Sequence, residues 1–167
     1  MIKIIWKNEE VPPSMKVKQV YGIVFNEEGR LLLKVSIENG KKIYSFAGGR
    51  PENFDKDRET TLKRELIEEI NSTLSEEVYY LGYQEIQEDN ITPFAQVRMT
   101  AMVKEIGEQK PDTDNGELYE RIYVSPNYAI KLLDWGEVGK AQIEKAMVVA
   151  KEKFCLEFPD DDKMISV

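Results

Sequence analysis

Histidine is entirely missing from the 167 residues of this chain. Its absence excludes a Ser-His-Asp triad, a metal site with histidine ligands and a histidine general base. Any catalytic chemistry must therefore use carboxylates, lysine, tyrosine, serine or threonine hydroxyls, or a bound metal ion.

Cysteine is nearly as scarce, because Cys155 is the only one. A single cysteine cannot form an internal disulfide, so we expect a reducing compartment, the cytoplasm. The chain also has no apolar stretch of membrane length, and its start, MIKIIWKNEE, lacks the apolar run of a signal peptide. We therefore expect no membrane as a partner.

Positive charge is in the minority, with 23 Lys and Arg against 31 Asp and Glu and a formal net charge of -8. This balance argues against a nucleic-acid polymer as the partner. A small phosphate-bearing molecule is compatible with it, because a bound metal ion reverses the charge of a site locally.

The apolar pattern predicts strands before and after one central helix. Strands are expected over residues 17–26, 30–36, 43–46, 78–86, 93–106 and 118–124, and later helices over 127–133 and 138–154. The central helix should begin at Asp55 or Asp57 and end near Asn71. This order predicts an α+β fold, in which a mixed β-sheet is flanked by helices as an α/β/α sandwich.

No repeat, linker or low-complexity tract divides the chain, so we expect one domain over residues 17–156. Residues 1–16 should form an N-terminal arm, which could serve a homodimer. Residues 157–167 contain the run PDDDK and should form an acidic, solvated C-terminal tail.

The most informative stretch is RELIEE, residues 64–69, just after a double glycine. On a helix that turns about 100° per residue, Glu65, Glu68 and Glu69 lie close together beside an apolar stripe. Three ionised carboxylates this close repel one another unless a cation compensates, and a hard divalent ion with oxygen ligands is the natural one. On spacing alone, a solvated helix face remains the alternative.

A strand, the pair Gly48-Gly49 and a helix bearing this motif closely resemble the signature of the Nudix hydrolase superfamily (MutT-like), G-x5-E-x7-R-E-U-x-E-E-x-G-U, where U is apolar. The matching positions are Gly49, Arg64, Glu65, Leu66, Glu68 and Glu69. The resemblance covers about residues 17–155 and implies the Nudix-like sandwich.

The chain departs from the signature in the loop before the helix. The segment from Gly49 to Arg64 is one residue longer than the signature allows, and Lys56 stands where a glutamate is expected. Asp55, or else Asp57, could replace that glutamate. Arg64, which belongs to the catalytic motif, is expected to pair with Glu65 or Asp55 and not to contact substrate.

The resemblance implies a Mg²⁺-dependent pyrophosphohydrolase, with Mn²⁺ as another suitable ion. Water would attack the diphosphate of a nucleoside diphosphate linked to another moiety. Metal ligands are implied at Glu68 and Glu69, together with the backbone carbonyl of Gly48. Glu65 would be a further ligand or the general base.

The family often adds an acidic ligand from a later loop. The carboxylates available there are Asp112, Asp114, Glu117 and Glu120. Among these four we favour Glu117, because it stands at the entry to the following strand.

Substrate-binding candidates are weaker. Arg50 could neutralise phosphate, although an ion pair with Glu52 would account for it equally well. Phe46 could stack on a base, although aromatic residues in strands more often belong to the core. The substrate itself is not determined by these residues.

A second hypothesis belongs to a different class, a Nudix-like nucleotide-binding or regulatory module without turnover. It is motivated by Lys56 and by the longer loop. Because all three helix carboxylates are retained, we favour the enzyme.

Overall fold

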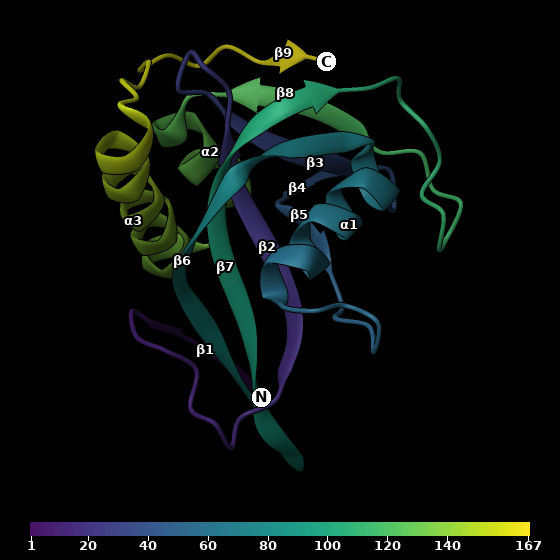
Figure 1. Ribbon diagram of the computed structural model, residues 1–167, viewed down its shortest axis with the longest axis vertical. Helices are drawn as coiled ribbons and strands as arrows, with labels where there is room; N and C mark the ends of the chain where they lie inside the picture. The colour runs from purple at the N-terminus through teal and green to yellow at the C-terminus, as the bar shows by residue number, and fades with distance from the viewer.

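Helices cover both faces of a mixed β-sheet in the computed structural model, which describes residues 1–167 (Figure 1). One face carries α1 (Arg58–Ile70), and the other carries α2 (Pro126–Leu133) and α3 (Gly136–Phe154). The predicted α/β/α sandwich is confirmed. No helix combines the length and the apolar character needed to cross a membrane.

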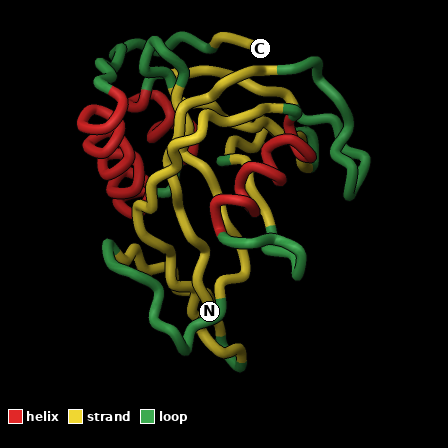
Figure 2. The backbone as a smooth tube through the Cα atoms, in the orientation of Figure 1, coloured by secondary structure: helices red, strands yellow, loops and turns green.

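The sheet has nine strands. Their bounds are β1 (Ile2–Lys7), β2 (Val17–Phe25), β3 (Leu31–Glu38), β4 (Lys41–Ser45), β5 (Ala47–Gly49), β6 (Ser72–Glu88), β7 (Ile91–Ile106), β8 (Glu120–Val124) and β9 (Ile165–Ser166). The main order is β1-β6-β7-β2-β3-β8-β9, with β4 beside β3 and β5 beside β2. Only β2 and β7 pair in parallel, and Figure 2 shows these strands between the two groups of helices.

The side chains of β2 point alternately into the two hydrophobic cores, one on each face of the sheet. Val20 and Val24 pack in the core under α1, whereas Ile23 and Phe25 pack in the core under α3. Successive side chains of a strand point to opposite faces, so a strand covered on both sides is apolar at nearly every position. The central strands therefore fix both helical layers relative to each other.

The ends of α1 follow their predicted caps. Asp57 is the N-cap, and its carboxylate accepts the backbone N–H of Thr60 at 2.8 Å. Asn71 ends the helix in the left-handed conformation, with φ of 49°, and its N–H donates to the carbonyl of Ile67. Of the two candidates for the start of the helix, Asp57 is therefore correct, and Asp55 is free for another role.

The expected arm and the expected solvated tail both add strands to the sheet. β1 pairs with β6, with Ile4 opposite Ile86, and β9 pairs with β8. Leu156 is buried, and the ring of Phe158 lies 5.5 Å from that of Phe25. Residues 157–167 are therefore tied to the fold by Phe158 and β9, while most of their side chains are exposed.

One ion pair fastens the acidic tail. Arg30 donates from both Nη atoms to the two carboxylate oxygens of Asp161, at 3.0 and 2.7 Å. The Ser125 hydroxyl donates to the Asp161 carbonyl at 2.7 Å. The hydrogen bonds from Arg30 lower the pKa of the Asp161 carboxyl to about 2.

We expect Asp161→Asn to lower the thermal unfolding midpoint at neutral pH. The folded pKa lies below the unfolded value of about 3.9, so the stabilisation is present above that value and is lost as pH falls toward 2. The difference in midpoint between the parent protein and the variant, measured by circular dichroism from pH 7 to pH 2, should therefore shrink below about pH 4.

The matched control is Asp162→Asn, because Asp162 only pairs at 3.5 Å with Lys131 and both side chains are exposed. This variant should unfold like the parent protein. Equal midpoints for the parent and Asp161→Asn at pH 7 would contradict the role given to the ion pair.

Candidate active site

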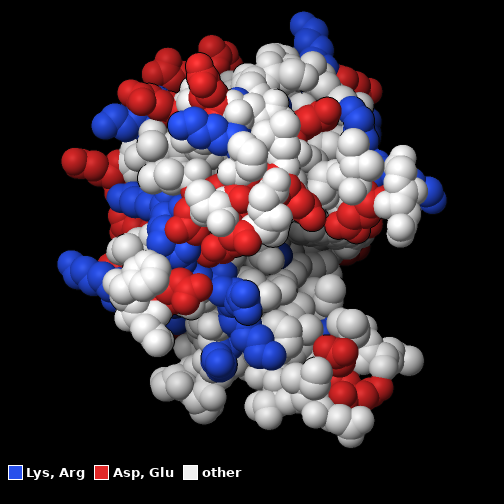
Figure 3. All heavy atoms as spheres, turned by 90° about the vertical axis from the view of Figure 1, so that its right-hand side faces the viewer, with Lys and Arg blue, Asp and Glu red and all other residues white.

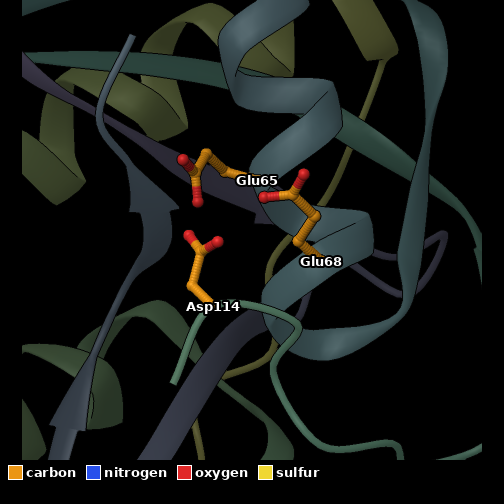
Figure 4. A group of neighbouring side chains, drawn as sticks. All are labelled: Glu65, Glu68 and Asp114. Carbon is orange, nitrogen blue, oxygen red and sulfur yellow. The ribbon is translucent and has the colours of Figure 1, made fainter. Parts of the chain in front are cut away.

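Two carboxylates of α1 and one from the loop before β8 converge (Figure 4). One oxygen atom from each of Glu65, Glu68 and Asp114 lies within 4.8 Å of the other two. Glu65 is buried, Glu68 is half-buried and Asp114 is exposed, so this acidic group reaches from the interior to solvent. Seen from the side of α1, acidic side chains gather across the middle of the molecule (Figure 3).

The double glycine lets β5 approach both α1 and β2. A Cβ on Gly49 would overlap the carboxylate of Glu65, and a Cβ on Gly48 would overlap the backbone of Val20 and Tyr21. Gly48 also has φ of 154°, which L side chains rarely adopt. These glycines are therefore part of a strand that needs close approach, and not of a plain turn.

Arg64 is surrounded by acceptors. Its Nε and Nη2 donate to the two oxygens of Asp55 at 3.0 and 2.8 Å, and its Nη1 donates to Glu65 at 3.0 Å and Glu68 at 2.9 Å. Nη2 also donates to the carbonyl of Arg50 at 2.9 Å. The hydrogen bonds to Asp55 are the main cause that raises the pKa of Arg64. The expected pairing of Arg64 with carboxylates is observed.

Asp55 is the carboxylate that the longer loop brings to Arg64. Its side chain is only 2% exposed, and it also accepts the N–H of Glu52 and the hydroxyl of Thr61. The hydrogen bonds from Arg64 hold the pKa of Asp55 well below its usual range. Lys56, the departure from the signature, is exposed to solvent.

Glu69 lies next to a cation that the sequence pattern did not single out. Its carboxylate is 3.1 Å from the Lys34 ammonium and accepts the N–H of Gly48 at 3.2 Å. Burial raises the pKa of Glu69, and Lys34 opposes that shift. Glu69, an expected metal ligand, is therefore outside the group of three carboxylates. The only signal for Lys34 is a lone cation in the apolar run LLLKV.

The loop before β8 places Asp114, and not Glu117, at the acidic group. The carboxylate of Asp112 accepts the N–H of Asp114 at 2.8 Å, which holds the turn. Glu117 is exposed and lines a separate depression beside Val35 and Ile37. Glu117 as the late ligand stays a prediction, and the fold of this loop adds Asp114 as the candidate that lies beside Glu65 and Glu68.

A cavity of about 470 Å³ lies close to Glu69. Lys34, which pairs with Glu69, is one of the residues that line it. Phe46, Tyr21 and Trp135 also line it. Phe46 is 1% exposed and meets the Trp135 ring edge to face, with centroids 5.4 Å apart. The volume lies within the range of small-molecule pockets, about 300–1,000 Å³.

The other two substrate-binding candidates lie elsewhere. Arg50 and Glu52 are exposed and are not among the residues that line the cavity. The backbone of each supports the Arg64–Asp55 pair, through the Arg50 carbonyl and the Glu52 N–H. The structure therefore gives them a part in the loop before α1.

The donors of the acidic group suit a hard divalent cation. All are carboxylate oxygens, which Mg²⁺ and Mn²⁺ prefer. Burial raises the pKa of Glu65, whereas the charge of Arg64 opposes that shift. Arg64 is shared among Glu65, Glu68 and Asp55, so negative charge is in excess. Because Gly49 lacks a Cβ, the Glu65 carboxylate can lie against β5, and these residues fit the ion.

One comparison identifies the family of the chain, and the solved structures share its fold. The profile of the NUDIX domain matches residues 15–146. Among solved structures, the pyrophosphohydrolase BsRppH of Bacillus subtilis has a TM-score of 0.65 at 18% identity and covers 87% of this chain and 90% of its own. A NUDIX hydrolase from Nitrosomonas europaea has a TM-score of 0.61 at 17% identity, with 80% and 90% covered.

The Ap4A hydrolase of C. elegans has a TM-score of 0.51 at 18% identity, with 81% of this chain and 98% of that chain covered. Identities this low bear on the fold alone. Among curated proteins, none matches this chain.

We expect Asp114→Asn to weaken Mg²⁺ binding by about tenfold or more, since loss of even an outer partner of a metal site costs about 10- to 100-fold in affinity. Glu117→Gln is the matched control from the same loop and should bind Mg²⁺ like the parent protein. Isothermal titration calorimetry measures both affinities. A larger loss of Mg²⁺ affinity in Glu117→Gln than in Asp114→Asn would instead identify Glu117 as the late ligand.

Proposed function

Because the chain belongs to the NUDIX domain family, whose profile matches residues 15–146, we propose that it is a Mg²⁺-dependent pyrophosphohydrolase. Its substrate would be a nucleoside diphosphate linked to another moiety. Water would attack the diphosphate and release a nucleotide and a second phosphorylated product. Family membership supports the enzyme class expected from the sequence, a hydrolase of phosphoanhydride bonds.

The observation that carries the proposal is the convergence of Glu65, Glu68 and Asp114. These three carboxylates would hold the divalent ion. When bound, the ion would neutralise charge on the diphosphate oxygens and lower the pKa of the attacking water.

The neighbouring residues position the acidic group. Arg64 donates to both Glu65 and Glu68, which orients their carboxylates, and it is itself held by Asp55. Glu65 would act as a ligand or would accept the proton of the attacking water, as expected from the sequence. In both roles its ionised form is required, and the hydrogen bond from Arg64 favours that form.

Glu69 has a different part in the proposed site. It fixes β5 through the Gly48 N–H, and Lys34 balances its charge. The backbone of Gly48, which the family resemblance offers as a carbonyl ligand, is thereby held beside α1. Lys34 would in turn bring a positive charge to the side of the site that adjoins the cavity.

No observation favours the second hypothesis, a binding or regulatory module without turnover. Lys56 was its main motivation, and Asp55 pairs with Arg64 in the place of the missing glutamate. Of the three helix carboxylates, Glu65 and Glu69 are buried and Glu68 is half-buried.

The test is hydrolysis of a panel of nucleoside triphosphates, ADP-ribose, NADH, diadenosine polyphosphates and nucleotide sugars with Mg²⁺. We expect turnover of at least one member. Glu68→Gln should lower kcat/KM by about two or more orders of magnitude, as loss of a major electrostatic stabiliser does, while the circular dichroism spectrum stays unchanged.

Glu59→Gln is the control on the same helix, because Glu59 pairs only with Lys63, at 2.9 Å. It should keep full activity. Inactivity of the parent protein across the panel with both Mg²⁺ and Mn²⁺, or full activity of Glu68→Gln, would refute the proposed function.

A further inference from the structure

A buried arginine without a carboxylate partner lines the cavity of about 470 Å³ beside the acidic group. Arg98, on β7, is 2% exposed, and its Nε donates to the side-chain oxygen of Gln142 at 2.8 Å. Its buried Nη1 has no hydrogen-bond partner. Burial lowers the pKa of Arg98 to about 10, so the side chain still carries its charge at neutral pH.

Aromatic rings cover the guanidinium without satisfying it. Its Cζ lies 4.8 Å from the centroid of Tyr21 and 5.9 Å from that of Phe46. Such rings stabilise a cation through their faces, but the structure shows no hydrogen bond from Arg98 to Tyr21 or Phe46. Together with Trp135, they form apolar walls around a buried donor.

The neighbouring amides give Arg98 a single acceptor, the side-chain oxygen of Gln142. Gln142 donates to Gln84, Gln84 donates to Gln96 at 3.0 Å, and Gln96 donates to Gln19 at 3.0 Å. The oxygens of Gln84 and Gln96 thus accept from other amides, and the Gln142 oxygen accepts from Arg98 Nε. A buried charge that has one neutral acceptor and no anion is unfavourable in the folded protein, so the fold alone does not explain Arg98.

The cavity lies where a substrate could occupy it and the acidic group together. Lys34 lines the cavity, and its ammonium is 3.1 Å from the carboxylate of Glu69. Tyr21 lines it as well and stands opposite Gly48 in the pairing of β2 with β5. One end of a bound molecule would therefore meet Arg98 while the other is near α1.

We propose that this cavity binds the base of the nucleotide substrate and that Arg98 selects a purine presenting two adjacent acceptors, as O6 and N7 of guanine do. The inference rests on the proposed function for the nature of the ligand. A guanidinium has donors only, so the amino group of adenine in the same place would oppose a donor with a donor. Three aromatic walls favour a planar ring over a free phosphate.

The experiment measures binding without metal and without turnover. GMP and AMP are titrated into the Trp6→Phe protein, in which Trp135 is the remaining tryptophan and reports on the cavity by fluorescence. GMP should quench the fluorescence and bind about tenfold or more tightly than AMP, because a bidentate arginine contact discriminates between bases by about that factor.

Arg98→Met keeps an unbranched apolar stem and removes the guanidinium with its charge, so GMP should bind no better than AMP. Removal of an unpaired buried charge is compatible with folding. Arg98→Lys, which keeps the charge without the two-pronged geometry, should also lose most of the preference, and it provides the test where Arg98→Met fails to fold. Thr100→Val is the control on the same strand, because Thr100 is buried, has an unpaired hydroxyl and does not line the cavity.

Equal affinities of the parent protein for GMP and AMP would overturn the proposal. A preference that survives in both Arg98→Met and Arg98→Lys would do the same, as would its loss in Thr100→Val. Quenching by inorganic phosphate at the concentrations that suffice for GMP would assign Arg98 to phosphate instead of base. An enzyme inactive on every substrate would refute the proposed hydrolysis and still leave the base preference measurable.

Discussion

Repulsion among the carboxylates beside α1 is the constraint on which the proposed site depends. Leu62 and Leu66 are fully buried and hold the helix against the sheet, which fixes Glu65 and Glu68 regardless of their charge. Packing energy thus maintains an electrostatically unfavourable arrangement. Arg64 offsets part of the repulsion, and in the proposed site a divalent cation would offset the remainder.

The two parts of the proposed site lie on different faces of the sheet. The acidic group lies on the side of α1, whereas the aromatic cavity with Arg98 draws its walls from residues packed on the side of α3. Short strand β5 and residue Lys34 connect the two, because β5 touches α1 through Gly49 and Lys34 touches both Glu69 and the cavity. A substrate would therefore be recognised at one end and cleaved at the other.

Features set by neighbours in sequence could be predicted, and features set by distant contacts could not. The caps of α1 and the pairing of Arg64 with carboxylates depend on a few successive residues. Strands β1 and β9 pair with partners far along the chain, so their places in the sheet could not be predicted from neighbouring residues. Asp114 was one of four candidates because loop conformation, and not composition, decides which carboxylate reaches the helix. Arg98 and Lys34 were visible only as lone cations within apolar strands.

The central claim is that Glu65, Glu68 and Asp114 hold a divalent ion together. Crystals grown with Mn²⁺ test it directly, because anomalous scattering locates the ion without reference to activity. The account predicts an anomalous peak in contact with carboxylate oxygens of all three residues. A well-occupied Mn²⁺ that none of these side chains touches, or no bound ion at saturating Mn²⁺, would contradict it.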